Sequence, residues 1–194
     1  MVNNFLDKKY VVISVMGPHA GESEGEIFKR KIGDAKNIGI TFWLMRSRQA
    51  KPSLVQRICK EARERNKNVV ALFIEASSTG GAMPTSSANS ATYYSADRKY
   101  WKNLPKGLSP VTGKIDKGAY ALTFDLLNLH NGMIDLWNYA DFFNQDSPIR
   151  IFQGASTLCA IKKDMSAHDN KIKSHNRKII AIGQLCNPYC VWLK

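Results

Sequence analysis

The stretch RKYWKNLPKGLSPVTGKIDKGAYALTFDLL, residues 98–127, decides how this chain is organised. It opens with five cationic or aromatic residues and continues through a turn-rich run at 104–110, where proline fixes φ and glycine frees it. From 119 to 127 apolar residues then alternate with others, which predicts a strand. The apolar face of this strand is expected to consist of Tyr120, Leu122, Phe124 and Leu126.

Trp101 stands at the start of this stretch, between basic residues and a stiff loop. A tryptophan in such a place suits the edge of a ligand site, because one face of the ring stays available for stacking. The alternative is a core anchor, since tryptophan is usually buried. The sequence leaves both interpretations open.

Length and composition indicate a single domain, residues 1–194, large enough to bury a hydrophobic core without the help of disulfides or metal ions. No apolar run approaches the roughly 18 residues of a membrane span, and the N-terminus lacks the apolar segment of a signal peptide. The four cysteines are too few for a disulfide scaffold in a chain of this length. We therefore expect a cytoplasmic protein with no membrane partner.

Net charge is the strongest bulk signal. The chain has 28 Lys and Arg against 16 Asp and Glu, which gives a formal net charge of +12. Such an excess favours a polyanionic partner, and nucleic acid, either RNA or DNA, is the default candidate. A basic surface that serves only solubility is the main alternative, and a module that docks an acidic protein partner is another.

Hydrophobic periodicity predicts the other elements of the fold. Residues 51–66 are expected to form a helix with Pro52 in its first turn, and a shorter helix is expected at 24–32. Asn131-Gly132 is a hairpin signal. Further strands are expected at 9–16, 40–46, 68–76, 149–152, 156–161 and 179–185. Strands concentrated after residue 68 predict an α+β domain, a curved mixed sheet or small open barrel with two or three packed helices.

Catalytic patterns are scarce. The four histidines stand in no recognisable constellation. Asp125, Asp135 and Asp141 are the acids that a metal-dependent nuclease or nucleotide-processing enzyme would use, and this is the alternative function. Capping and turn roles explain them more economically, so we expect no enzyme activity and no cofactor.

The spacing of the histidines and cysteines near the C-terminus also argues against a zinc site. His168, His175, Cys186 and Cys190 have the ligand types that zinc prefers. The two histidines are too far apart for the common motifs, and a strand is expected between them and the cysteines. We therefore expect core cysteines and no metal.

Basic residues interleave with aromatic ones between 93 and 106. Aromatic faces stack on any base, while neighbouring cations neutralise phosphates. The pattern predicts a nucleic-acid-binding module with Trp101 and Tyr94 at the base, and Arg98, Lys102 and Lys106 at the phosphates.

Six segments, taken in order, resemble YTH domains and their prokaryotic EVE relatives within the PUA-like superfamily. They are FWLMRS at 42–47, VVALFI at 69–74, Trp101 followed by LPKGLS at 104–109, LWN at 136–138, PIRI at 148–151 and LC at 158–159. The resemblance covers residues 40–162 and implies a PUA-like fold for that core. Residues 1–38 and 165–194 are then extensions without a counterpart.

YTH domains hold N6-methyladenine of RNA in an aromatic cage, and EVE-like domains are associated with modified bases in DNA. The resemblance therefore implies a reader of a modified or flipped base, which burial and stacking in an aromatic box would favour. It implies Trp101 as a cage wall, Leu108 lining the cage, Ser47 near the base edge and Arg150 at a phosphate. Trp43 is the first alternative wall, although its place in an apolar strand favours the core.

Overall fold

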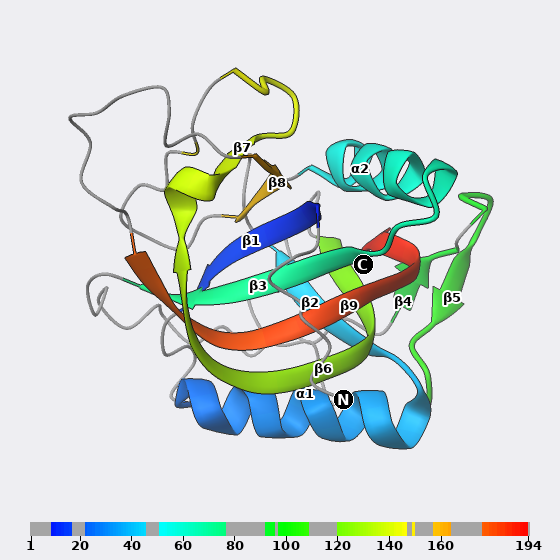
Figure 1. Ribbon diagram of the computed structural model, residues 1–194. Coiled ribbons are helices and arrows are strands. Elements are labelled where there is room, and N and C mark those ends of the chain that lie inside the picture. Colours follow the sequence, from blue (N-terminus) through cyan, green and yellow to red (C-terminus); the bar gives the residue numbers. More distant parts are fainter. Residues whose placement is uncertain are drawn as a thin grey trace.

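The structure is a computed structural model that describes residues 9–16, 22–45, 51–76, 92–95, 97–108, 120–146, 149, 157–163 and 176–193. In chain order these residues form β1 (Tyr10–Met16), α1 (Glu24–Ile38), β2 (Thr41–Met45), α2 (Pro52–Glu64), β3 (Val69–Glu75), β4 (Thr92–Tyr94), β5 (Trp101–Asn103), β6 (Tyr120–Asp135), the 3-10 helix η2 (Leu136–Asn138), β7 (Tyr139–Asp141), β8 (Thr157–Lys162) and β9 (Asn176–Trp192) (Figure 1).

Seven of these strands make one mixed sheet in the order β2-β6-β9-β3-β1-β8-β7, and β4 pairs with β5 alone. Only β1 and β3 run parallel in the seven-stranded sheet, while all its other neighbours are antiparallel. The expected α+β architecture on a mixed sheet is confirmed for the described residues. The sheet is not a closed barrel, because β2 and β7 end it without pairing to each other.

Segments outside residues 40–162 supply interior strands of this sheet. β1 lies between β3 and β8, and β9 lies between β6 and β3. β9 runs beside β6 over most of the length of both strands, and the pair bends strongly together (Figure 1). The described parts of residues 1–38 and 165–194 are therefore structural members of the fold.

Irregular pairing between β6 and β9 produces the bend. The register passes from Leu122 opposite Cys190 to Phe124 opposite Leu185, so β9 carries extra residues there. That excursion contains the cis Asn187–Pro188 bond and Tyr189 with φ of +66°. Extra residues in one strand of an antiparallel pair bend the ladder and increase its twist.

Two expectations for β6 were wrong for the same reason. The register shifts again between Phe124 and Leu126, so Leu126 is 39% exposed and Leu127 is buried in its place. Asn131-Gly132 is not a hairpin, because β6 continues through it to Asp135. One extra β6 residue between Leu129 and Gly132 forms a bulge there instead.

Helix α1 begins and ends with regular caps. The Ser23 hydroxyl accepts from the Glu26 backbone N–H, and the Glu26 carboxylate accepts from the Ser23 backbone N–H, which is a capping box. Gly39, with φ of +80°, terminates the helix in the left-handed conformation. The helix therefore extends to Ile38, beyond the expected 24–32.

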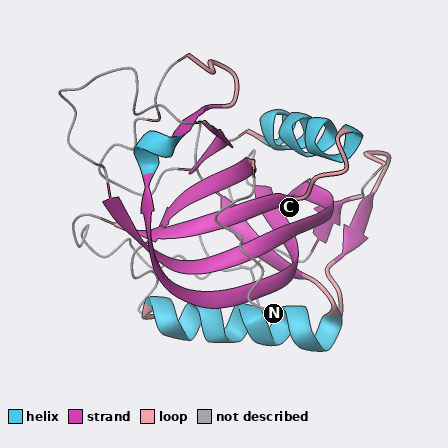
Figure 2. Ribbon diagram, viewed as in Figure 1, coloured by secondary structure: helices cyan, strands magenta, loops and turns pink. Residues whose placement is uncertain are grey.

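Helix α2 matches its expected position, with Pro52 in the first turn. Both helices bury apolar residues in one cluster with the sheet: Ile27 and Phe28 come from α1, and Val55, Ile58, Cys59 and Ala62 come from α2. α1 lies along the long bent strands, and α2 lies at the other end of the molecule (Figure 2). Among the described residues, neither helix has the length and apolar character that crossing a bilayer requires.

Candidate nucleic-acid interface

The hairpin β4–β5 carries the predicted aromatic residues. Its register places Tyr93 opposite Lys102 and Tyr94 opposite Trp101. It lies beside the C-terminal end of β9, to which Tyr93 is joined by a bridge to Leu193 (Figure 1). The run at 93–106 therefore forms a short two-stranded projection from the main sheet.

Ser95 organises the turn between the two strands. Its buried hydroxyl accepts from the backbone N–H groups of Lys99 and Tyr100, both at 3.2 Å, and donates to the Asp97 carboxylate. This hydrogen bond from Ser95 holds the pKa of Asp97 below its usual value. The backbone closes with Ser95 N–H donating to Tyr100 C=O at 2.7 Å. The turn is thus held by hydrogen bonds that one side chain largely supplies.

Trp101 is a surface residue, 41% exposed, so it is not a core anchor. Its ring meets that of Tyr94 edge to face, with centroids 5.2 Å apart and planes at 60°. Such a contact orients the two rings relative to each other, and a large part of the Trp101 side chain still faces solvent. The structure therefore brings together the two aromatic residues that sequence placed at the base.

The opposite face of the hairpin is a packing face. Tyr93 packs on Phe42 with ring centroids 5.3 Å apart, and Leu104 and Leu108 join the same apolar cluster. Leu108 therefore packs, partly buried, against the apolar cluster that contains Phe42. Pro105 accepts a turn hydrogen bond from Leu108 N–H at 3.3 Å, which closes the turn-rich run as expected.

The three cations that the sequence assigned to phosphates lie at different places on the hairpin and the turn that follows it. Lys102 is opposite Tyr93, so its side chain leaves β5 on the face away from Trp101, where its Nζ lies 5.2 Å from the centre of the Tyr100 ring. Arg98 is exposed in the turn that joins β4 to β5, where its backbone has a φ of +58°. Lys106 is exposed in the turn that follows β5.

Trp43 lies in the core. It is 9% exposed, stacks on Phe28 with centroids 5.1 Å apart and contacts Phe73 at 4.5 Å. No face of its ring is available to a base, so the core interpretation holds. Ser47 and Arg150 lie outside the described residues.

Trp192 at the end of β9 is an aromatic residue that the sequence interpretation missed. It is 38% exposed, and its ring meets that of buried Tyr120 edge to face at 6.1 Å. The only sequence signal was an aromatic residue at the end of an apolar run, YCVWLK, which a terminal strand explains equally well.

Two of the three acids that the alternative enzyme would use, Asp135 and Asp141, accept backbone hydrogen bonds with local structural roles. Asp135 accepts from Trp137 N–H at 3.1 Å and caps η2. Asp141 accepts from Phe143 N–H at 2.7 Å and Asn144 N–H at 3.0 Å in a tight turn. Within the described ranges, no three His, Cys, Asp or Glu residues gather as a metal site.

The cysteines are thiols of the interior. Cys59, Cys159 and Cys190 are buried and Cys186 is partly so. Burial raises the pKa of each, that of Cys186 to about 11, which disfavours the thiolate that a metal would need. His168 and His175 lie outside the described residues.

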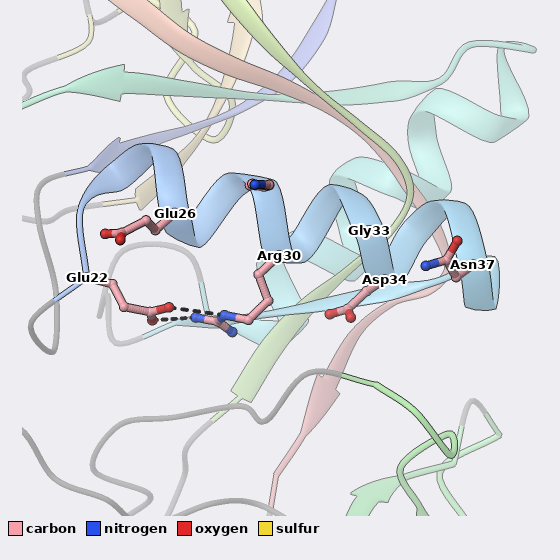
Figure 3. A pocket seen from close by; sticks show the side chains of 7 residues that line it. Glu22, Glu26, Arg30, Gly33, Asp34 and Asn37 are labelled. Carbon is pink, nitrogen blue, oxygen red and sulfur yellow. Dashed lines mark hydrogen bonds and ion pairs between the residues drawn. The ribbon is translucent and has the colours of Figure 1, made fainter.

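A shallow hollow along α1 is lined by charged side chains (Figure 3). Arg30 donates to both carboxylate oxygens of Glu22, at 3.2 and 2.5 Å. Glu26 belongs to the capping box, and Asp34 accepts from the Thr41 hydroxyl at 3.2 Å. The hydrogen bonds and ion pair of Glu22, Glu26 and Asp34 stabilise α1 and its contacts, so these acids have structural roles.

Fold and site together define a strand-rich α+β protein with an exposed aromatic hairpin. Comparisons with protein-family models, curated proteins and solved structures find no match to this chain.

Proposed function

We propose that this protein binds nucleic acid at the β4–β5 hairpin and recognises a modified or flipped base there, without catalysis of its own. The observation that carries the proposal is the half-exposed Trp101, oriented by Tyr94 on a projecting hairpin. A base stacked on such a ring gains about 1–3 kcal/mol. The proposed relation to YTH and EVE domains of the PUA-like superfamily makes N6-methyladenine the first modification to test.

Electrostatics support the same ligand class. Four cations, Arg98, Lys99, Lys102 and Lys106, are exposed on or next to the hairpin, with Asp97 as the acid among them. The whole chain carries +12. Phosphate neutralisation supplies affinity without sequence preference, and stacking adds preference for an unpaired base. We further propose that the protein acts in the cytoplasm.

A binding panel tests this function. Labelled oligonucleotides, single- and double-stranded and with or without N6-methyladenine, are titrated at low salt. We expect the unpaired strands to bind more tightly than duplexes, with a further preference for the methylated base. Equal affinity for methylated and unmethylated strands would remove the reader role and leave general binding.

The same panel examines the alternative enzyme. Each oligonucleotide is incubated with Mg²⁺ or Mn²⁺ and then with EDTA, and its length is followed on a gel. We expect every strand to remain intact. Cleavage that EDTA abolishes, and that Asp125→Asn or Asp141→Asn removes, would favour the metal-dependent nuclease instead.

A further inference from the structure

A row of aromatic residues crosses from the hairpin to the main sheet. Leu193, directly after β9, forms an antiparallel bridge with Tyr93 of β4. In an antiparallel pair the next residue of one strand faces the previous residue of the other, so Tyr94 faces Trp192. Opposed side chains leave the backbone on the same face of a sheet. Tyr94 and Trp192 therefore share a face.

The same register extends the row at both ends. Tyr94 is opposite Trp101 of β5, and Trp192 is opposite Tyr120 of β6. Each end pair makes an edge-to-face ring contact, at 5.2 Å for Trp101–Tyr94 and 6.1 Å for Tyr120–Trp192. The strands β5, β4, β9 and β6 thus each contribute one ring to a single row.

The two exposed tryptophans stand at different points of this row. Trp101 is 41% exposed and Trp192 is 38% exposed, while Tyr120 is buried in the main core. Arg98 is exposed in the turn that joins β4 to β5, next to this row. An open, partly cationic aromatic surface therefore continues from the hairpin onto β9.

The spacing of the tryptophans decides what the surface fits. Neighbouring strands lie about 4.8 Å apart, so the two strand steps from Trp101 to Trp192 span about 10 Å. A single base held between two rings needs only about 7 Å, which is two stacking steps of about 3.4 Å. The row is therefore wide for one sandwiched base and suits separate bases on separate rings.

We propose that Trp192 is a second base-stacking platform, so that the site takes a single strand of at least two unpaired nucleotides lying across β5, β4 and β9. This rests on the proposed function. Trp101 stacks one base and Trp192 stacks a neighbouring one, while Tyr120 holds the Trp192 ring from below. Arg98 supplies positive charge to the phosphates of the bound strand.

The test compares ligand length in matched variants. Affinities of a mononucleotide, a dinucleotide and an octanucleotide are measured for wild type, Trp192→Leu and Trp192→Phe, with thermal melting of each. Trp192→Leu keeps apolar packing and removes the stacking face, and Trp192→Phe keeps a ring. Phe143→Leu is the control, since Phe143 is a 37% exposed aromatic residue outside the row.

Trp192→Leu is expected to weaken the dinucleotide and octanucleotide about 5- to 150-fold and to leave the mononucleotide unchanged. Trp192→Phe and Phe143→Leu should stay near wild type. If Trp101→Ala weakens binding but folded Trp192→Leu does not, the second platform is wrong and the proposed function stands. If wild type binds no oligonucleotide at low salt, the proposed function itself fails. Should Trp192→Leu not fold, equal wild-type affinity for mononucleotide and dinucleotide overturns the inference.

Discussion

At the scale of the residue, two tryptophans have opposite surroundings in the structure. Trp43 is packed between Phe28 and Phe73, whereas Trp101 contacts Tyr94 and is 41% exposed. Their sequence settings already differ, because Trp43 stands in the apolar run ITFWLM and Trp101 stands among basic residues in RKYWKN. Their stabilising contributions differ accordingly.

We expect Trp43→Ala to lower the free energy of unfolding by about 3–5 kcal/mol, because it leaves a large cavity in the core. Trp101→Ala should cost about 1 kcal/mol or less, the scale of one aromatic contact. Urea unfolding of both variants measures the difference. Similar losses for the two would show that Trp101 is structural.

Arg98 and Lys102 form a second contrast, since Lys102 leaves β5 on the face away from Trp101 while Arg98 is exposed in the turn between β4 and β5. Arg98 has φ of +58°, so Arg98→Gly removes the charge without demanding a strained backbone. We expect Arg98→Gly to reduce the slope of log affinity against log salt by about one unit. Lys102→Ala, as the matched loss of a cation from the other face, should change it less. An equal effect of the two variants would contradict the assignment of faces.

At the scale of the element, the bend of β6 and β9 depends on close packing at Gly183. A Cβ atom there would lie 2.7 Å from Cδ1 of the buried Phe124 ring and 3.1 Å from Leu127. Gly33 of α1 has no such neighbour within 4 Å. A side chain is therefore excluded by close neighbours at Gly183, whereas there is space for one at Gly33.

Gly183→Ala is expected to destabilise the protein by about 1–3 kcal/mol through overpacking. Gly33→Ala should stabilise it by about 1 kcal/mol, because alanine is the better helix former and meets no clash. Thermal melting of both variants provides the comparison. A Gly183→Ala protein as stable as wild type would mean that the bend tolerates a side chain at this position.

Sequence periodicity predicted the elements whose pattern is local. Helix α2 and strands β1 and β3 fall close to their expected positions, because their apolar residues repeat with an uninterrupted period. It failed in β6, where bulges arise from pairing with β9 about 60 residues away and move burial from Leu126 to Leu127. The alternation of apolar and polar residues within one strand does not indicate where a distant strand will form a bulge with it.

In the candidate site, too, sequence predicted the residues that are close together along the chain and missed those that distant pairing brings together. Trp101 and Tyr94 were predicted because they occur close together in a basic, aromatic run. Trp192 was missed, since its proximity to Tyr94 depends on a bridge between segments about 100 residues apart. The packing of Leu108 against the cluster around Phe42 was not foreseen either, because it joins segments more than 60 residues apart.

At the scale of the whole molecule, the buried thiols couple stability to pH. The pKa values of Cys59, Cys159, Cys186 and Cys190 are raised by burial from the ordinary value of 9.0. Above pH 9 the unfolded chain loses these protons while the folded protein keeps them, so stability falls as pH rises. Lys31 acts in the opposite sense, because burial lowers its pKa to about 8 and the unfolded chain then binds the extra proton between pH 8 and 10.5.

Four thiols outweigh one lysine, so we expect the free energy of unfolding to decline between pH 9 and 10.5, partly offset by Lys31. The decline should be about 1–2 kcal/mol for each of the buried thiols Cys59, Cys159 and Cys190, and less for Cys186, which is only partly buried. Urea unfolding across that range measures the decline. The double variant Lys31→Met/Asp34→Asn removes the buried pair, whose Nζ and Oδ2 lie 3.8 Å apart, and should steepen the decline. Stability that is constant from pH 9 to 10.5 would contradict the buried state of the thiols.

The central claim is that Trp101 stacks a base while cations hold the phosphates. The most direct measurement is the affinity of one unpaired oligonucleotide as a function of salt, for wild type and for Trp101→Ala of verified fold. We predict steep salt dependence in both proteins with nearly equal slopes, and a loss of about 5- to 150-fold in Trp101→Ala at every salt concentration. Wild-type affinity in the folded Trp101→Ala protein, or no binding by wild type at low salt, would contradict the account.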